Sequence, residues 1–277
     1  VQDSLGVLGE EYGEIVEAAF TQRWVDHATN IGKSTGAFCS STYGSHSYIL
    51  MSWSDNMRGA FTLAHEVGHA GHLMLSARYQ RMVNSRPSMY FIEAPSTMNE
   101  LLLAEHLRSQ SEDKRLRRWV IMQLLNTYYH NFITHLLEGE LQRRVYDRAM
   151  QDQAITAKVL GDLKGDVLSS FWGDALELTE DAKLTWMRQP HYYMGLYPYT
   201  YSAGLTLSTN MMQIIREEGR PAVDRWLEVL KAGGSKTPLE LAKMAGVDMS
   251  DPAAISKAVD YVGSLVSELC ELFEEEA

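Results

Sequence analysis

The pentapeptide His65-Glu66-Val67-Gly68-His69 constrains this chain more than any other segment, because its polar side chains can act together only on a helix. In a helix, positions i and i+4 lie on one face, so the imidazoles of His65 and His69 can reach one cation. Glu66 then lies beside that cation and can accept a proton from a water that the cation holds. The small and apolar residues on both sides of the motif indicate a buried helix with an inward-facing site. The motif predicts zinc-dependent hydrolysis of a peptide bond.

A tetrahedral catalytic zinc site takes three protein ligands and keeps one position open for water. The extended motif that supplies a third histidine is absent, since a leucine occupies the required position. We expect Glu93 to be the third ligand, because it follows His69 by 24 residues and Pro95 suits the first turn of a new helix. We expect His72, a further turn along the motif helix, to lie behind the metal, and Glu100 to orient a ligand imidazole.

Two segments of the chain carry a family resemblance. They are His65-Glu66-Val67-Gly68-His69-Ala70-Gly71-His72 and Glu93-Ala94-Pro95-Ser96-Thr97-Met98-Asn99-Glu100. Together they resemble the zinc site of the thimet oligopeptidase and oligoendopeptidase F peptidases. The resemblance continues over most of the chain, in residues 36–53, 191–204, 230–235 and 245–249, and the last two of these segments are most similar to the oligoendopeptidase F branch.

The resemblance implies a mainly α, zincin-like helical catalytic domain with a small β-hairpin or sheet beside the motif helix. It implies a zinc metalloendopeptidase that cleaves internal bonds of short peptides, with one zinc ion on His65, His69 and Glu93 and with Glu66 as general base. Members of the family are longer, and their helical N-terminal portion forms one wall of a deep channel. We therefore expect residues 1–277 to form a single catalytic domain that lacks this wall. Apolar surface exposed there would favour self-association or binding of an N-terminal fragment.

One stretch near the middle of the second half is rich in tyrosine. Phenol hydroxyls and imidazole N–H groups can stabilise the oxyanion that forms when water adds to a carbonyl. An aromatic helix packed into the core would have the same composition. The resemblance favours catalytic roles for His191, Tyr197 and Tyr201, and their spacing places the two tyrosines on one helical face. We expect Tyr193 and Tyr199 to contact the substrate.

Residues 36–53 are the best strand and hairpin candidate, because aromatic, β-branched and hydroxyl residues surround a central glycine turn. An exposed strand edge beside the motif helix could pair with an extended peptide, although a small sheet could equally only complete the core. The resemblance favours substrate binding by Gly36, Ala37, Phe38 and Tyr48. The rest of the chain predicts helices near 5–30, 57–84, 94–112, 115–150, 155–171, 190–217, 221–232, 237–245 and 252–275.

Composition and charge exclude several classes of protein. The formal charge is −11 and basic residues are not concentrated in one stripe, so we expect no binding to nucleic acid. No apolar run reaches the roughly 18 residues of a transmembrane helix, so we expect no membrane insertion. Cys39 and Cys270 are the only cysteines, and two unpaired thiols indicate a reducing, cytoplasmic location.

Two other functions stay open from the sequence. A zinc aminopeptidase or carboxypeptidase would use the same metal chemistry on a peptide terminus. A non-catalytic helical domain that binds peptides is the alternative that is not an enzyme. The helix predicted over 115–150 contains His135 and Glu138 three residues apart, which we interpret as structural rather than as a second metal site.

Overall fold

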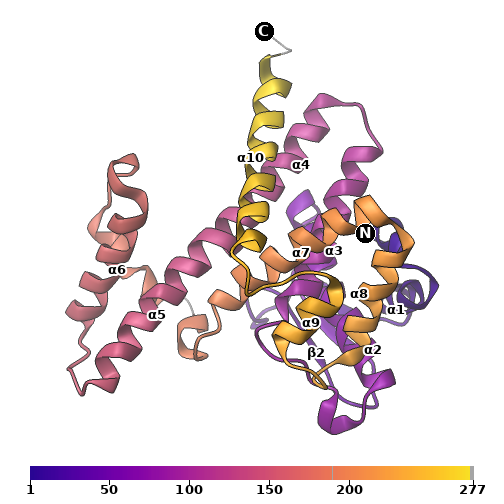
Figure 1. Ribbon diagram of the computed structural model, residues 1–277, viewed down its shortest axis with the longest axis horizontal. Coiled ribbons are helices and arrows are strands. Elements are labelled where there is room, and N and C mark those ends of the chain that lie inside the picture. The colour runs from indigo at the N-terminus through magenta and orange to yellow at the C-terminus, as the bar shows by residue number, and fades with distance from the viewer. Residues whose placement is uncertain (189, 275–277) are drawn as a thin grey trace. The chain divides into compact units, whose positions relative to one another are not determined.

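The computed structural model describes residues 1–188 and 190–274, which fall into two compact units (Figure 1). The first unit comprises Val1–Tyr128 and Ala203–Ala277, and the second comprises Tyr129–Ser202. Helix α7 (Tyr199–Glu218) begins in the second unit and continues in the first. The chain is mainly helical with one small sheet, as the sequence predicts.

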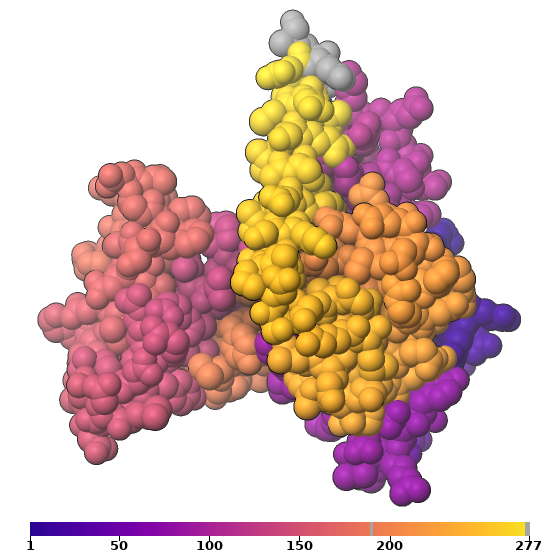
Figure 2. All heavy atoms as spheres, viewed as in Figure 1, coloured from indigo at the N-terminus to yellow at the C-terminus, as the bar shows by residue number. Residues whose placement is uncertain are grey.

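The first unit begins with a short helix, η1 (Asp3–Leu8), and α1 (Glu10–Thr21). The sheet follows, and then come α2 (Met57–Tyr79), η2 (Met82–Asn84), α3 (Glu93–Ser109) and α4 (Lys114–Thr127). After α7 the chain adds α8 (Arg220–Ala232), α9 (Pro238–Ala245) and α10 (Ala253–Glu274). Helix α10 packs on α4, and much of its length lies at the surface (yellow in Figure 2).

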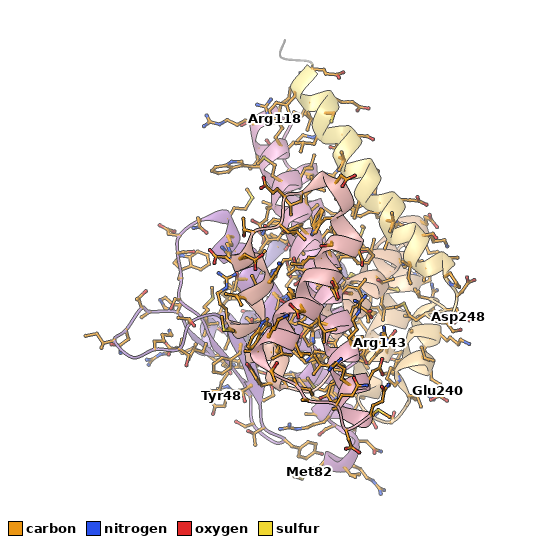
Figure 3. All side chains as sticks on the ribbon, turned by 90° about the vertical axis from the view of Figure 1, so that its left-hand side faces the viewer. Tyr48, Met82, Arg118, Arg143, Glu240 and Asp248 are labelled. Atoms are coloured by element: carbon orange, nitrogen blue, oxygen red, sulfur yellow. The ribbon has the colours of Figure 1, made fainter. Side chains whose placement is uncertain are left out.

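The sheet has three strands in the order β1-β3-β2. Strands β2 (Phe38–Ser41) and β3 (Ser47–Leu50) form the predicted antiparallel hairpin, and β1 (Val25–Asp26) pairs with β3 in parallel. Side chains alternate along β3, so Ile49 is buried while Tyr48 is 53% exposed. Tyr48 is labelled in Figure 3. Strand β2 lies at one edge of the sheet and contacts α2.

Helix α2 is the centre of the first unit and packs against α1, α3, α8 and both strands of the hairpin. Its start is fixed by Asn56, whose side chain accepts a hydrogen bond from the backbone N–H of Gly59 at 2.9 Å. Its contact with α3 is a close backbone approach. A Cβ atom added to Gly68 would lie 2.5 Å from the carbonyl oxygen of Pro95 and 2.6 Å from the Cα atom of Ser96. The glycine that weakens the motif helix therefore lets the next helix approach it.

Helix α7 approaches α3 in the same way from another side. A Cβ atom added to Gly204 would lie 2.8 Å from the Cβ atom of Glu93. Buried hydroxyls join the two helices, with Thr97 Oγ1 and Ser208 Oγ 2.8 Å apart. The first turn of α3 is thus enclosed by both neighbouring helices.

The second unit is helical. Its elements are the π-helical stretch η3 (Tyr128–Thr134), α5 (His135–Met150), α6 (Ala157–Trp172), η4 (Gly173–Ala175), η5 (Glu180–Met187) and η6 (Pro190–Tyr193). Helices α5 and α6 pack against each other, and η5 packs on α6. The chain from α4 to α5 matches the single helix predicted over 115–150, with η3 as a local change of winding.

Two predicted helices differ from the structure. The helix expected near 5–30 ends at Thr21, because Arg23 adopts a left-handed φ of 62° and the chain then enters β1. The helix expected over 190–217 begins at Tyr199, because Gly195 has a φ of 70° and Pro198 disfavours helix in the residue before it. Residue 275, the last of the helix expected over 252–275, lies outside the described residues.

Within residues 1–188 and 190–274, no helix is both long and apolar enough to cross a membrane.

The approach of α2 and α3 makes a prediction about stability. We expect Gly68→Ala to lower the free energy of unfolding by about 1–3 kcal/mol, since the new methyl group would clash with the backbone of α3. Gly13→Ala in α1 is the matched control, because nothing lies within 4 Å of its added Cβ atom, and it should stabilise the protein by about 0.5–1 kcal/mol. Urea unfolding of the metal-free protein measures both changes, and equal free energies for Gly68→Ala and the parent would contradict this packing.

Candidate metal centre

Three side chains from α2 and α3 converge in the first unit. One ligand atom from each of His65, His69 and Glu93 can be chosen so that all three lie within 4.8 Å of one another. Glu93 Oε2 is 3.3 Å from His65 Nε2 and 3.4 Å from His69 Nε2. Both histidines come from one face of α2, and the carboxylate comes from the first residue of α3. The cluster joins residues that the sequence separates by 24 positions.

This spacing fits a tetrahedral zinc ion. Ligand atoms bound to one zinc ion at about 2.0–2.1 Å with tetrahedral angles lie roughly 3.3–3.4 Å apart. Two nitrogens and one carboxylate oxygen are a donor set that zinc hydrolases use, and it leaves a fourth position for water. His65, His69 and Glu93 therefore fit a catalytic zinc ion in chemistry and in spacing.

The His65 imidazole is held from behind by Glu100. Its Nδ1 atom lies 2.7 Å from Glu100 Oε1, and the other oxygen of Glu100 accepts a hydrogen bond from Thr127 Oγ1 of α4 at 3.0 Å. Burial alone would lower the pKa of His65, but the carboxylates of Glu100 and Glu93 raise it well above its usual value. An Nδ1–H donated to Glu100 leaves Nε2 to face Glu93.

Glu93 is almost fully buried, with 1% of its surface exposed. Burial favours its neutral form, yet the neighbouring imidazoles of His69 and His65 hold the pKa of Glu93 well below its usual value. The hydroxyl of Ser96, one turn further along α3, donates a hydrogen bond to Glu93 Oε2 at 2.9 Å. The carboxylate is therefore ionised and fixed in position before any ion binds.

Glu66 projects from the same helix as the two histidines, and only 5% of its surface is exposed. Burial raises the pKa of Glu66, while the charges of His65 and His69 oppose this shift. Its Oε2 atom has no hydrogen-bond partner among the residues that the structure describes. A buried carboxylate with a raised pKa and an open oxygen is suited to accept a proton.

His72 is fully buried on α2, and its ring packs edge-to-face on Phe91 with 5.8 Å between centroids. Burial and the nearby His69 lower the pKa of His72 to about 3, so the ring is neutral. Within the described part of the chain neither of its nitrogens has a hydrogen-bond partner. Its predicted place behind the metal stays a prediction.

Three of the residues predicted to bind substrate in the first unit lie at the start of the edge strand, whereas the fourth, Tyr48, lies on the central strand β3. Gly36 has a left-handed φ of 87°, Ala37 follows it, and Phe38 opens β2 with 48% of its surface exposed. Cys39, the next residue, lies near enough to Glu66 that this carboxylate, after burial, raises the pKa of the thiol to about 12. Strand β2 therefore runs past Glu66, and its thiol stays protonated there.

A groove of about 460 Å³ follows β2 and the turn after it. Its other side is apolar and comes from the second half of α2 and from the segment that leads to Glu93, with Leu73, Met74, Met89 and Ile92 among its residues. The groove is therefore continuous in sequence with both elements that supply the cluster.

The predicted tyrosines and histidine of the second unit form a cluster of their own. The rings of His191 and Tyr197 stack with 5.5 Å between centroids. Tyr201 Oη lies 3.5 Å from His191 Nε2 and 3.3 Å from Tyr197 Oη. Tyr193 is 73% exposed, and Tyr199 is the first residue of α7. Both stay predictions as substrate contacts, as do the catalytic roles of the other three.

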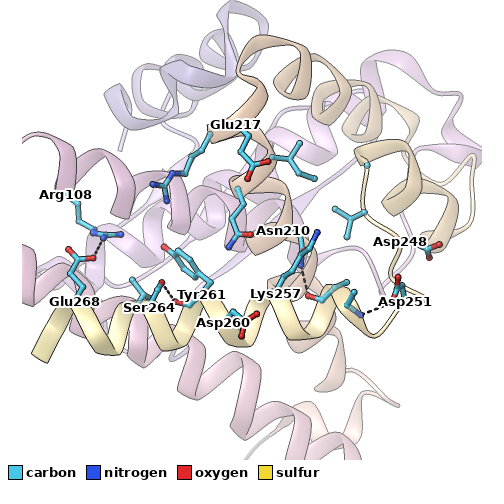
Figure 4. Close-up of a pocket in the computed structure, with 18 residues that line it drawn as sticks. Arg108, Asn210, Glu217, Asp248, Asp251, Lys257, Asp260, Tyr261, Ser264 and Glu268 are labelled. Atoms are coloured by element: carbon cyan, nitrogen blue, oxygen red, sulfur yellow. Dashed lines mark hydrogen bonds and ion pairs between the residues drawn. The ribbon is translucent and has the colours of Figure 1, made fainter. Parts of the chain in front are cut away.

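A hollow with many charged residues lies elsewhere in the first unit, between α7, α10 and residues 246–251 (Figure 4). It has a volume of about 910 Å³, and two of the charged residues in its lining, Arg108 and Glu268, form an ion pair. This hollow is not lined by His65, Glu66, His69 or Glu93. Its size alone assigns it no chemistry.

Sequence analysis missed the hydroxyls that support the cluster. Ser96 had a local signal, since a serine three residues after a helix-initial carboxylate can reach back to it. Thr127 had none, because its contact with Glu100 joins residues on different helices. Asn99 donates to the Ala64 carbonyl oxygen at 3.1 Å and accepts from Tyr12 at 3.2 Å, which ties α1, α2 and α3 together just before the motif.

Comparison with known proteins gives one consistent result. The sequence model of Peptidase family M3 matches residues 2–261. Oligopeptidase PepF of Bacillus subtilis (strain 168) is 34% identical over 271 residues, which are 98% of this chain and 39% of that protein. The plasmid oligoendopeptidase F of Lactococcus lactis subsp. cremoris is 29% identical over 274 residues, which are 99% of this chain and 46% of that protein. The chain spans less than half the length of these two relatives.

A solved structure has the same fold. The crystal structure of oligoendopeptidase-F from Enterococcus faecium matches with a TM-score of 0.70 at 24% identity, over 99% of this chain and 43% of that one.

The support of His65 by Glu100 predicts a change in metal affinity. We expect Glu100→Gln to weaken zinc binding by about 10–100-fold, because the imidazole loses the charged partner that orients it. Glu105→Gln is the matched control, since Glu105 lies on the same helix and pairs with Arg108 at 2.9 Å. Titration against a zinc-selective chelator measures both affinities, and equal affinities for the two variants would refute the role of Glu100.

Zinc binding should weaken as the pH is lowered. The raised pKa of His65 means that a proton competes for the ligand nitrogen of the metal-free protein up to a higher pH than for an ordinary histidine. Zinc must displace that proton, so its apparent affinity should fall as the pH is lowered and should level off above the raised pKa. Chelator competition over a series of pH values tests this, and an affinity that does not change with pH would contradict it.

Proposed function

The chain belongs to peptidase family M3, and on that basis we propose that it is a zinc-dependent endopeptidase that hydrolyses internal bonds of short peptides. The observation that carries the proposal is the cluster of His65, His69 and Glu93, in which the carboxylate oxygen lies 3.3–3.4 Å from both imidazole nitrogens. The Oε2 atom of Glu66, on the same helix, has no hydrogen-bond partner within the described part of the chain. We further propose that residues 1–277 act as one catalytic domain, although they form two compact units.

The proposed metal is zinc, held by His65, His69 and Glu93. When bound, it would make a water acidic enough to lose a proton near neutral pH and would polarise the scissile carbonyl. Glu100 keeps the Nε2 atom of His65 turned towards the ion, and Ser96 does the same for the carboxylate of Glu93.

Glu66 is the proposed general base and later the general acid. Its burial raises its affinity for a proton, and its Oε2 atom has no hydrogen-bond partner among the residues that the structure describes. It would take the proton from the attacking water at Oε2 and would deliver it to the nitrogen of the leaving amine. The oxyanion formed between these steps needs donors, and we propose His191, Tyr197 and Tyr201 for this role.

An extended peptide is the substrate that the edge strand fits. Strand β2 pairs with β3 on one side only, so its other edge can form backbone hydrogen bonds with a peptide. Backbone pairing depends little on sequence, and the apolar groove beside β2 can accept a side chain. Peptides of varied sequence are therefore the proposed substrates, with Gly36, Ala37, Phe38 and Tyr48 along their path.

The location and the partners of the protein are also proposals. We propose a cytoplasmic protein that does not bind nucleic acid, as its charge of −11 indicates. The relatives carry more than half of their length outside the matched region, so an N-terminal portion or a second copy is a proposed partner.

The test of this function is cleavage of an internally quenched peptide that is blocked at both ends. We expect turnover with zinc, none after chelation, and a loss of about 10²–10⁴-fold in kcat for Glu66→Gln with zinc content unchanged. His65→Ala should lose both zinc and turnover, and Glu105→Gln should match the parent.

Each contrary result has a definite meaning. Cleavage by Glu66→Gln at the parent rate would refute Glu66 as base. Cleavage of unblocked but not blocked peptides would show an exopeptidase. Peptide binding without turnover by the zinc-loaded chain, even with the N-terminal portion of a relative added, would favour the binding module.

A further inference from the structure

The second unit buries polar groups that the proposed mechanism does not use. Helix α5 supplies His135, Glu138 and Gln142, and α6 supplies Lys164, and each of these side chains is at least 95% buried. Burying ionisable groups is costly unless they pair with each other, so such a group is retained only where its contacts compensate. These contacts all lead to the residues around Tyr201.

His135 and Glu138 form a pair along one turn of α5. His135 Nδ1 lies 2.7 Å from Glu138 Oε2, and the carboxylate thereby fixes the plane of the imidazole. One face of the His135 ring stacks on the ring of Tyr201, with 4.4 Å between centroids and an interplanar angle of 19°. The His130 ring is also near, with its centroid 4.5 Å from that of His135, and the His191 ring lies further away at 6.0 Å. The pair therefore forms the support on which the Tyr201 ring rests.

Gln142 and Lys164 hold the loop that carries the other two groups. The amide of Gln142 donates to the backbone carbonyl oxygens of Tyr192 and Gly195, and Lys164 Nζ donates to Tyr192 Oη at 3.1 Å. Burial lowers the pKa of Lys164 and raises that of Tyr192 far above its usual value, so the two groups meet in a dry environment. The loop is thus attached to both α5 and α6.

The three polar groups that this support holds lie close together. Tyr201 Oη lies within 3.5 Å of both His191 Nε2 and Tyr197 Oη, so a tilt of the Tyr201 ring would displace all three. A donor to an oxyanion must lie about 2.7–3.1 Å from it, and a misplacement of about 1 Å can cost roughly 10²-fold in rate. Rigid support of this cluster would matter to catalysis for that reason.

We propose that His135, oriented by Glu138, is a positioning residue that fixes Tyr201 for oxyanion stabilisation. The inference rests on the proposed function, because it assumes that Tyr201 acts on the oxyanion. His135 contacts neither substrate nor metal in this role and acts only through the ring that it supports. The competing interpretation is that the pair only stabilises the packing of α5.

His135→Asn separates these interpretations. The Asn amide can donate to Glu138 as Nδ1 does, which keeps the buried carboxylate paired, while the ring under Tyr201 is removed. We expect kcat to fall about 10–100-fold. KM, zinc content and the temperature of thermal unfolding should stay close to those of the parent. The affinity for a phosphinic peptide that mimics the tetrahedral intermediate should fall by the same factor as kcat/KM. His27→Asn makes the same change at an exposed site and should leave every value unchanged.

A double-variant cycle with Tyr201→Phe completes the test. If His135 acts through Tyr201, adding His135→Asn to Tyr201→Phe should lower kcat no further. Multiplicative losses, or a parent kcat in a folded His135→Asn protein, would overturn the proposal. A parent kcat for Tyr201→Phe alone would instead refute the role of Tyr201, whereas the proposed endopeptidase activity itself stands or falls with Glu66→Gln.

A second variant serves if His135→Asn does not fold. In His135→Phe/Glu138→Leu both members of the buried pair become apolar and a planar ring remains under Tyr201, while buried Lys164 loses the charge of Glu138. We expect its kcat to stay within about 3-fold of the parent, since supporting contacts are preserved. A loss as large as that expected for His135→Asn, in a folded protein with its zinc, would overturn the proposal.

Discussion

The backbone contact between α2 and α3 at Gly68 is the constraint on which the metal cluster depends. A ligand carboxylate from a second helix can lie 3.3–3.4 Å from both imidazoles only if the two helix axes come unusually close. Gly68 permits this by leaving room for the carbonyl oxygen of Pro95, and Gly204 of α7 presses on Glu93 from another side. The glycine in the motif thus costs helix propensity of about 1 kcal/mol but allows Glu93 to reach the histidines.

The close approach of α2 and α3 gathers more negative than positive charge in one place, and a bound cation would neutralise the excess. Three carboxylates, those of Glu66, Glu93 and Glu100, are each at least 93% buried around two imidazoles. Even with one imidazole protonated, the group carries excess negative charge in a medium that solvates charge poorly. A divalent ion between Glu93 and the two histidines would neutralise most of it. The same geometry explains why protons and metal compete at His65, since both would occupy the position that the carboxylates favour.

The sequence predicted those parts of the fold and the site that depend on local pattern. The motif helix, the hairpin and the helix that begins at Glu93 all follow from periodicity and turn residues. The contacts of Thr127 with Glu100 and of Tyr12 with Asn99 could not be predicted, because they join residues on separate helices. The predicted helix over 190–217 failed where one left-handed glycine and one proline interrupted an apolar stretch, and a division into two units has no signal in the sequence.

Two histidine–carboxylate pairs in this protein have the same geometry and different surroundings. His65 and His135 each have Nδ1 2.7 Å from a glutamate oxygen, at Glu100 and Glu138 respectively. In both pairs the carboxylate fixes the ring, so the function of the pair depends on what the rest of the ring meets. The Nε2 atom of His65 lies 3.3 Å from Glu93 Oε2, whereas one face of the His135 ring stacks on the ring of Tyr201. Sequence spacing alone therefore could not assign a role to the second pair, since the chemistry of an oriented imidazole is set by its neighbour in space.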